Sequence, residues 1–181
     1  MTGTAYIVTK ILSAMTVVGG ITTILIALAV IRKKFASGTL QKIALDYGLF
    51  GLFLLSVGAL VGSLYFSNVI GFSPCVLCWW QRIFMYPQVL ILGLATWKKD
   101  FSALSYSLLL SATGGIVALY QTYILFGGAH LFPCSAETTS SCSKVFFLEF
   151  GYVTIPTMSL TAFALLAIMV VSIMQARNKV E

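Results

Sequence analysis

The sequence has very little charge. Only 9% of its 181 residues are Asp, Glu, Lys or Arg, whereas about a quarter of an average globular chain is charged. Hydrophobic residues make up 59%, and the chain shows no internal repeat, low-complexity tract or soluble domain. This composition excludes an ordinary soluble protein, a disordered chain and a nucleic-acid-binding protein. It indicates a polytopic membrane protein instead.

Long segments without charge predict where the chain crosses the membrane. A spanning helix needs about 20 mainly apolar residues. Charge-free segments of this length cover residues 11–31, 47–70, 101–126 and 152–175, and a fifth segment, 74–97, carries one charge. Because isolated strands cannot satisfy their backbone in lipid, all five segments are predicted to be helices. We therefore expect an all-α membrane protein.

The basic residues predict the orientation of these helices. Eight of them lie on one side of the membrane: Arg32, Lys33, Lys34, Lys42, Lys98, Lys99, Arg177 and Lys179. Only Lys10, Arg82 and Lys144 lie on the other. The positive-inside rule makes the first side cytoplasmic, so the N-terminus is expected outside and the C-terminus inside. The first segment is predicted to be a retained helix, because its positive cluster follows it rather than precedes it.

Two glycine pairs lie inside predicted helices. Gly58 and Gly62 form a GxxxG pair in the second helix, and Gly114 and Gly115 lie in the fourth. Small residues allow helices to approach closely in lipid. Both pairs are therefore predicted to be helix-packing sites.

The first cysteine pair forms a C-x-x-C motif at the start of the third helix. Ser73 is the predicted N-cap, and Pro74 the first helical residue. Cys75 and Cys78 then share one helix face, close enough to form a disulfide. A helix N-terminus also stabilises a thiolate. As a structural cross-link so small a loop would contribute little stability, so the motif favours redox chemistry.

Arg82 follows Cys78 by one helical turn on the same face. An ionisable residue at membrane depth is a functional candidate, although its side chain could instead reach the interface. The guanidinium could stabilise the Cys78 thiolate or donate a hydrogen bond to a carbonyl of a lipid-soluble ligand. Trp79 belongs either to an interfacial aromatic belt or to the wall of a planar ligand site.

The second pair, Cys134 and Cys142, is separated by seven small or polar residues. This turn-like composition predicts a mobile segment, and a mobile disulfide near a fixed C-x-x-C motif would permit exchange between them. Residues 144–150 are predicted to form a short amphipathic helix at the interface. Two structural disulfides, or a zinc or copper site, would also explain four cysteines. No metal is expected, because an oxidising compartment favours disulfides and the second spacing is loose. His130 is interpreted as a loop residue.

The segment Pro74-Cys75-Val76-Leu77-Cys78, followed by Arg82, resembles the DsbB family of membrane disulfide-bond formation proteins, including its shorter BdbC-like members. The resemblance runs from Tyr47 to near Gln175 and includes the order of the two cysteine pairs. It implies a four-helix transmembrane bundle of DsbB type over residues 43–181, with redox loops at 71–82 and 127–151. An additional N-terminal transmembrane helix and a basic cytoplasmic loop, residues 1–42, precede this bundle. The implied location is the bacterial cytoplasmic membrane, with all four cysteines on the outward face.

The resemblance also implies an activity, that of a membrane thiol oxidase. A soluble DsbA-like oxidase of thioredoxin fold would be reoxidised at Cys134, with Cys142 as the partner cysteine. Electrons would pass to Cys75 and Cys78 and leave to the membrane quinone pool, either ubiquinone or menaquinone. The implied catalytic residues are Cys75, Cys78, Cys134 and Cys142. The candidate quinone-binding residues are Arg82, Trp79, Gln81 and Gln121.

Three alternatives differ in chemistry. Proteins like vitamin K epoxide reductase place their loop cysteines before the C-x-x-C motif, which is the reverse of the order here. A transmembrane electron conduit would need cysteines deep within its helices. A metal-handling or structural membrane subunit would have inert cysteines, and metal content and thiol titration would distinguish it.

Overall fold

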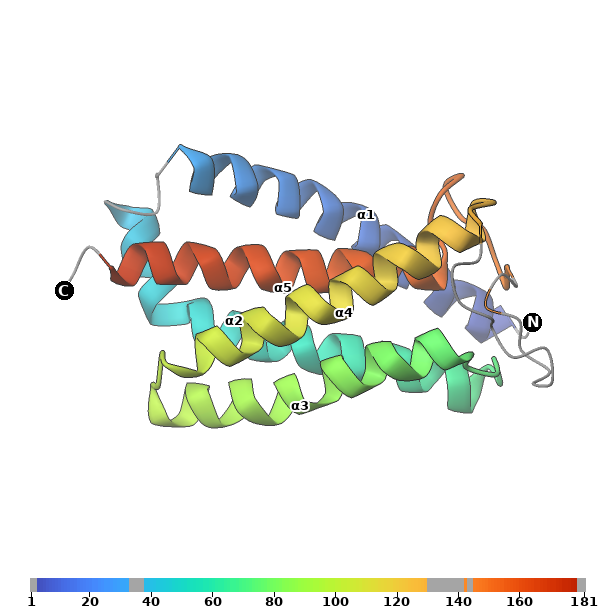
Figure 1. The fold of residues 1–181 in the computed structure, drawn as a ribbon, viewed down its shortest axis with the longest axis horizontal. Helices are drawn as coiled ribbons and strands as arrows, with labels where there is room; N and C mark the ends of the chain where they lie inside the picture. The colour runs from blue at the N-terminus through green and yellow to red at the C-terminus, as the bar shows by residue number, and fades with distance from the viewer. Residues whose placement is uncertain (1–2, 33–37, 130–141, 143–144, 179–181) are drawn as a thin grey trace.

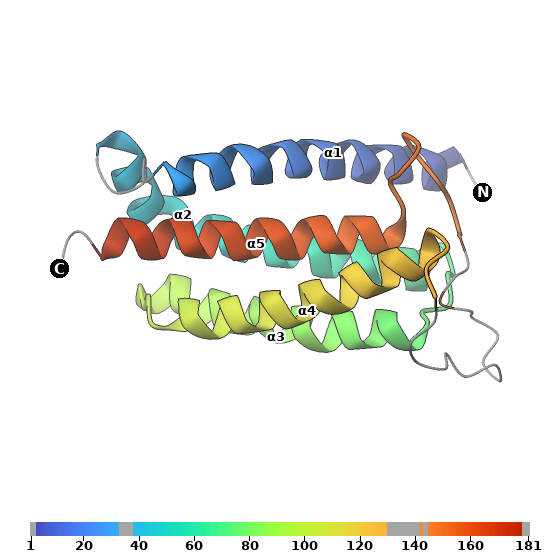
Figure 2. The same cartoon turned by 45° about the horizontal axis from the view of Figure 1, so that its top comes forward.

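The protein is a bundle of helices that run along its long axis (Figures 1 and 2). The computed structural model describes residues 3–32, 38–129, 142 and 145–178. These residues form α1 (Gly3–Ile31), α2 (Thr39–Leu64), α3 (Val76–Lys98), α4 (Ala103–Leu125) and α5 (Ile155–Arg177). A π-helix, η2 (Tyr65–Val69), continues α2. The described residues contain one isolated β-bridge and no longer strand, so the predicted all-α fold is confirmed.

Four of the five described α-helices are long and apolar enough to span a membrane, namely α1, α2 with η2, α4 and α5. The fifth, α3, is as long as α4 and α5, at 23 residues each. It is more polar, because it carries Gln81, Arg82 and Gln88. It runs alongside the other helices through the bundle (Figure 2). A four-helix bundle with one additional N-terminal helix therefore describes the molecule.

The helices extend beyond the charge-free segments from which they were predicted. α1 begins well before Lys10, and α2 begins before Lys42. A charged residue marks the membrane boundary rather than the helix end, because a long side chain can reach a polar partner. Lys10 does so by forming an ion pair with Glu149. The predicted domain boundary after residue 42 lies within α2, and the division itself stays a prediction.

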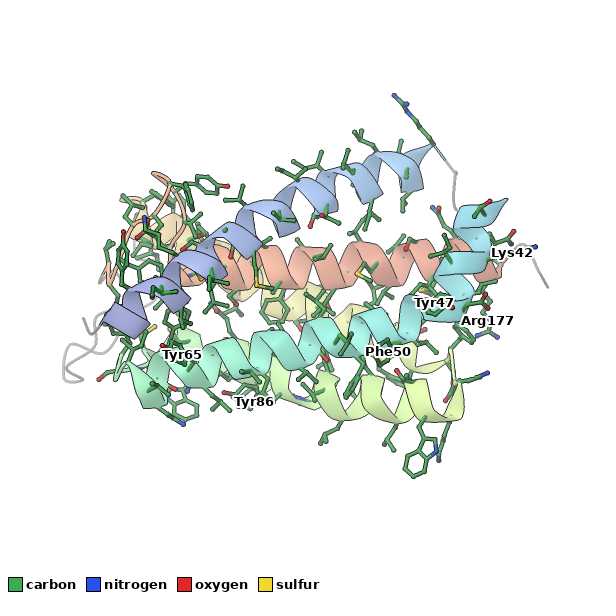
Figure 3. All side chains as sticks on the ribbon, turned by 180° about the vertical axis from the view of Figure 1, so that it is seen from behind. Lys42, Tyr47, Phe50, Tyr65, Tyr86 and Arg177 are labelled. Atoms are coloured by element: carbon green, nitrogen blue, oxygen red, sulfur yellow. The ribbon has the colours of Figure 1, made fainter. Side chains whose placement is uncertain are left out.

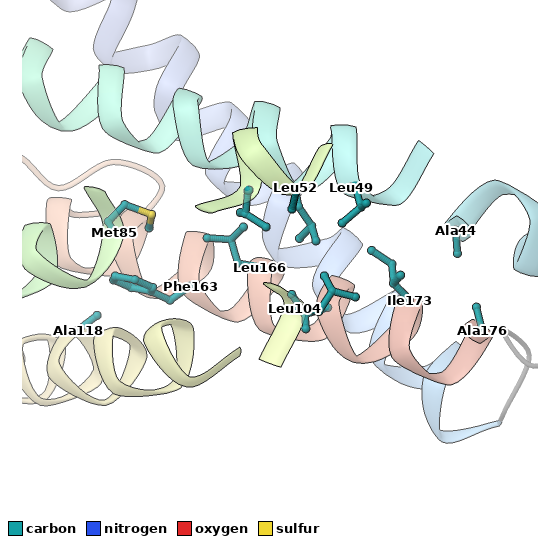
Figure 4. Close-up of a cluster of buried hydrophobic side chains, with 13 residues drawn as sticks. Ala44, Leu49, Leu52, Met85, Leu104, Ala118, Phe163, Leu166, Ile173 and Ala176 are labelled. Atoms are coloured by element: carbon teal, nitrogen blue, oxygen red, sulfur yellow. The ribbon is translucent and has the colours of Figure 1, made fainter. Parts of the chain in front are cut away.

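The core is built around α5, which packs against α1, α2 and α4. Its side chains Phe163, Leu166 and Val170 are fully buried. They meet Leu52 of α2 and Leu104 of α4 (Figure 4).

A buried polar contact also joins α3 to α4. Gln88 Oε1 accepts hydrogen bonds from Ser107 Oγ at 2.9 Å and Ser111 Oγ at 3.0 Å. Such hydrogen bonds join helices in lipid, where apolar side chains gain little from leaving the membrane.

The two predicted glycine packing sites behave differently. A Cβ atom at Gly114 would lie 2.4 Å from the Phe163 ring, so this glycine lets α4 approach α5 and the prediction holds there. A Cβ atom added at Gly115 would lie 3.6 Å from the Cβ of Phe163, which is ordinary contact. At Gly58 and Gly62 the prediction is wrong, since an added Cβ would meet nothing within 4 Å. The reason is that α1 packs on α5 rather than on the glycine face of α2.

The end of the second redox loop also differs from the prediction. Residues 145–150 form no helix. A turn brings the backbone of Glu149 against Val153 instead, with hydrogen bonds of 3.0 and 2.8 Å. Phe146 and Phe147 both turn toward other aromatic rings, as described below, whereas Val145, Leu148 and Phe150 are exposed. The predicted mobile segment, together with Cys134 and His130, lies outside the described residues.

Candidate active site

The C-x-x-C motif lies at the N-terminus of α3, at the end of the bundle that also holds the N-terminus of the chain (Figure 1). Cys75 is the N-cap, with an extended backbone, and its carbonyl accepts the first helical hydrogen bond from Trp79 N–H at 3.1 Å. The N-cap thus lies two residues after the predicted one at Ser73, because Phe72 is held in an aromatic cluster and the segment stays extended to Cys75. The Cys75 and Cys78 sulfurs are 3.0 Å apart.

Gln121 of α4 contacts both sulfurs. Its Nε2 lies 3.2 Å from Cys75 Sγ and 3.3 Å from Cys78 Sγ, within hydrogen-bond reach of each. Its Oε1 accepts a hydrogen bond of 2.6 Å from Gln81 Nε2. Both amides are buried, and their mutual bond fixes the side chain of Gln121. The arrangement gives either sulfur an amide donor when that sulfur is negatively charged.

Arg82 lies one turn below Cys78 and is held by α2. Its Nε donates to Ser63 Oγ at 3.0 Å, and its Nη2 donates to the Ser63 carbonyl at 3.1 Å. Its guanidinium also stacks over the Trp79 ring, 5.2 Å from the ring centre. No carboxylate among the described residues forms an ion pair with it. The positive charge therefore remains available to a thiolate or to a polar ligand group.

Cys142 of the second redox loop is brought to the same place. It is buried, at 3% exposure. It lines a small cavity of about 30 Å³ together with Cys75, Cys78 and Gln121. The sulfur-bearing residues Cys75, Cys78 and Cys142 therefore line one cavity.

An aromatic cluster holds this part of the second loop against the first. Phe72 of the first loop stacks on Phe146 at 4.4 Å, and Phe66 of η2 stacks on Phe147 at 5.5 Å. Phe66 and Phe72 also stack on one another at 6.2 Å. The two redox loops thus share an aromatic anchor, which joins Phe72 of the first loop to Phe146 and Phe147 of the second.

Cys78 also lines a large cavity of about 680 Å³. Gln81 and Arg82 line it together with Cys78, and most of its remaining wall is apolar side chains of α1, α2 and α5. Its volume lies within the range of about 300–1,000 Å³ that is usual for small-molecule sites. Of the two cysteines of the C-x-x-C motif, Cys78 lines both cavities, whereas Cys75 lines only the small one.

Most of the residues selected from the sequence meet at this site. Cys75, Cys78, Gln81, Arg82 and Gln121 lie in mutual contact or along one cavity wall. Trp79 is not among the residues that line either cavity, and it contacts the site through Arg82.

Two residues escaped the sequence analysis. Tyr86 lies one turn beyond Arg82 and also lines the large cavity, so its helical spacing from Cys78 and Arg82 could have identified it. Ser63, which holds Arg82, has no such signal, because only the packing of α2 on α3 brings the two together.

Residues 46–173 match the family model described as disulfide bond formation protein DsbB. The chain belongs to the DsbB family. This confirms the resemblance and establishes a membrane protein with a role in disulfide-bond formation. The DsbB match begins inside α2, so α1 lies outside it.

Named relatives agree with the DsbB assignment. The probable disulfide formation protein C 1 of Bacillus anthracis is 43% identical over 123 residues, which are 68% of this chain and 88% of that protein. Disulfide bond formation protein C of Bacillus subtilis is 38% identical over 122 residues, covering 66% and 87%. A probable disulfide formation protein of Metapseudomonas resinovorans is 37% identical over 123 residues, covering 66% and 84%. No solved structure matches the chain.

As a DsbB-family protein, the chain is a multi-pass membrane thiol oxidoreductase. The family also implies a partner that is itself a thiol oxidase. Among the described residues no three His, Cys, Asp or Glu side chains gather as a metal site.

Proposed function

We propose that the protein reoxidises an extracytoplasmic DsbA-like oxidase of thioredoxin fold and passes the electrons to a membrane quinone. The observation that carries this proposal is the position of Cys78. The Cys78 sulfur lies 3.0 Å from the Cys75 sulfur, and both residues line the small cavity together with Cys142. Cys78 also lines the large apolar cavity, as Arg82 does. One sulfur thus connects a thiol-exchange site to a site for a lipid-soluble molecule.

The exchange steps follow from thiolate chemistry. A thiolate of the reduced partner attacks Cys134 of a Cys134–Cys142 disulfide and displaces Cys142 as a thiolate. The second partner thiol then closes the partner's disulfide and releases Cys134. The Cys142 thiolate attacks Cys75 of the Cys75–Cys78 disulfide, and Cys78 leaves as a thiolate beside Gln121 and Arg82.

The remaining steps restore both pairs. Cys134 attacks Cys142, re-forms the second disulfide and releases Cys75. Cys75 and Cys78 then give up two electrons and two protons and return to the disulfide. The chemistry that a bound quinone supplies is the acceptance of these two electrons and two protons, which converts it to the quinol. The net reaction turns a partner dithiol and a quinone into a partner disulfide and a quinol.

The residues around the large cavity fit a quinone. Its walls are mainly apolar, as a lipid-soluble ring requires. The guanidinium of Arg82 is fixed by Ser63 and supplies hydrogen-bond donors for a carbonyl oxygen. The position of Arg82 one turn from Cys78 places the donor and the reactive sulfur on the same wall.

The test uses the purified full chain in detergent with a reduced thioredoxin-fold oxidase and a soluble quinone. Partner thiols and quinone absorbance are followed together. We expect coupled loss of both signals, and we expect the Cys78→Ser variant to abolish quinone reduction. Full quinone reduction by Cys78→Ser would rule out this mechanism. Oxidation of the partner without quinone turnover would identify an exchange protein with a different electron acceptor.

A further inference from the structure

The large cavity extends well beyond Cys78 and Arg82, and α1 forms one of its walls. The cavity-lining residues of α1 recur at helical spacing along one face: Val8, Leu12, Met15, Thr16 and Gly19. The same helix packs on α5, and Lys10 ties it to Glu149 of the second redox loop. A helix that lies outside the family match is thus built into the wall beside the reactive sulfur.

The opposite wall, on α2, has an open strip. Gly58 and Gly62 lie one turn apart on the cavity face, and a Cβ atom at either would meet no atom within 4 Å. These glycines therefore do not pack against another helix, and their missing side chains leave space in the cavity. Leu54, one turn further along α2, also lines the cavity.

The α3 wall carries a line of polar groups. Cys78, Arg82 and Tyr86 occupy successive turns and all line the cavity, so the line is about 12 Å long at 1.5 Å per residue. The Tyr86 hydroxyl oxygen is buried and has no hydrogen-bond partner among the described residues. A buried hydroxyl of this kind calls for a polar partner. Figure 3 shows Tyr86 between α2 and α3, in the part of the bundle away from Lys42 and Arg177.

Side chains that line the cavity are exposed on both α1 and α2. Met15 of α1 is 63% exposed and Leu54 of α2 is 52% exposed, although both line it. A molecule whose ring lies against the polar α3 wall can therefore keep a long apolar substituent in the space between α1 and α2, and that substituent can continue into the lipid.

We propose that the space between α1 and α2 binds the isoprenoid tail of the quinone, so that α1 is part of the substrate site and gives a preference for tailed quinones. The inference rests on the proposed function, because it places the ring at Cys78 and Arg82. Lipid is as apolar as the cavity, so the tail gains packing contacts rather than hydrophobic free energy. The tail therefore produces a preference and not an absolute requirement.

The experiment fills the space from each side and compares two naphthoquinones with and without a tail. Gly58→Leu fills it from α2, and Met15→Trp fills it from α1. The matched controls are Gly20→Leu, where an added Cβ also meets nothing within 4 Å, and Val18→Trp, since Val18 is 62% exposed. Neither control residue is among those that line the cavity.

Binding is measured on the oxidised protein, which has no thiol to reduce the quinone. The readout is the rise in the thermal unfolding midpoint with menaquinone-4 and with menadione, which lacks the tail. We expect menaquinone-4 to raise the midpoint more than menadione does in the unsubstituted protein and in both controls. We expect this excess to disappear in Gly58→Leu and Met15→Trp. In turnover, the ratio of kcat/KM for the tailed to the tailless quinone should fall about tenfold in the same two variants.

Two outcomes overturn the inference while the proposed function stands. One is an equal midpoint shift by both quinones in the unsubstituted protein. The other is an excess that survives in both filled variants, which would assign the space to a membrane lipid chain. If neither quinone shifts the midpoint or accepts electrons while partner exchange persists, the quinone acceptor itself is wrong and the inference fails with it. Partner exchange in each variant shows that it is folded.

Discussion

Gln121 is the one side chain within hydrogen-bond reach of both sulfurs of the C-x-x-C motif among the described residues. During exchange the negative charge moves between these sulfurs, and an amide donor between them can follow it without any helix moving. Gln81 holds the amide in this orientation through the 2.6 Å bond to Oε1. A charged residue here would favour one protonation state, whereas a neutral amide serves both cysteines.

We predict that Gln121→Leu slows reduction and reoxidation of the C-x-x-C pair about tenfold. A hydrogen bond to a charged group contributes about 1.5–3 kcal/mol, and about 1.4 kcal/mol is a factor of ten. Stopped-flow measurement of quinone reduction in a single turnover checks this. Gln81→Leu is the control, because it keeps the donor to the sulfurs and removes only the group that orients it, so its effect should be smaller. An unchanged rate in Gln121→Leu would show that the contact has no part in the reaction.

We predict that Arg82→Ala raises KM for the quinone about tenfold or more, because a charged donor to the carbonyl is lost. Exchange between the partner and the cysteines, measured without quinone, should change far less. Arg82→Lys should give a KM for the quinone between those of the unsubstituted protein and Arg82→Ala, since it keeps the charge but not the two hydrogen bonds to Ser63. Equal loss of quinone use and of exchange in Arg82→Ala would point to a folding defect rather than to a role in quinone binding.

At the scale of the helices, the sequence predicted the elements well and their faces poorly. Charge-free length located α1, α2, α4 and α5, and the spacing within α3 put Cys78 and Arg82 on one wall. α2 is apolar nearly all round, so no polar stripe along it marks the face that packs. The spacing of Gly58 and Gly62 therefore predicts a packing site where the structure has none. Nor does any pattern along the chain relate Gln121 to the sulfurs, because that contact exists only once α4 lies against α3.

The two glycine sites differ in a way that can be measured. We predict that Gly114→Ala lowers the free energy of unfolding by about 1–3 kcal/mol, the usual cost of overpacking a core. Its Cβ would lie 2.4 Å from the fully buried Phe163 ring, which has no room to move. Gly58→Ala should cause no loss, since its Cβ meets nothing. Equilibrium unfolding in mixed detergent micelles compares the two, and equal stability would mean that α4 and α5 adjust without cost.

For the whole molecule, most of the described basic residues lie at the end opposite the cysteines. Arg32, Lys42, Lys98 and Arg177 lie where helices begin or end, away from Cys75 and Cys78 (Figure 1). The positive-inside rule therefore predicts that the cysteines face away from the cytoplasm. This orientation is what the proposed partner requires.

We predict that alkaline phosphatase, which is active only outside the cytoplasm, is active when fused after Gly128 and inactive when fused after Asn178. Each fusion retains the basic residues at the cytoplasmic helix ends that precede its fusion point, and these should keep the preceding helices in this orientation. A cytoplasmic reporter at the same two positions should give the opposite pattern. Activity of the phosphatase at Asn178 would reverse the orientation and exclude exchange with an extracytoplasmic partner.

The contact between α1 and α5 has a consequence for biosynthesis. The first helix of the chain packs chiefly on the last, with α2, α3 and α4 made in between. At about 5–20 residues per second, a nascent α1 waits several seconds in the bilayer before α5 emerges. The wall that α1 gives the large cavity therefore forms last, after the C-x-x-C motif has already been delivered to the membrane surface. A chain that is truncated before α5 would leave α1 without its main partner and exposed to membrane proteases.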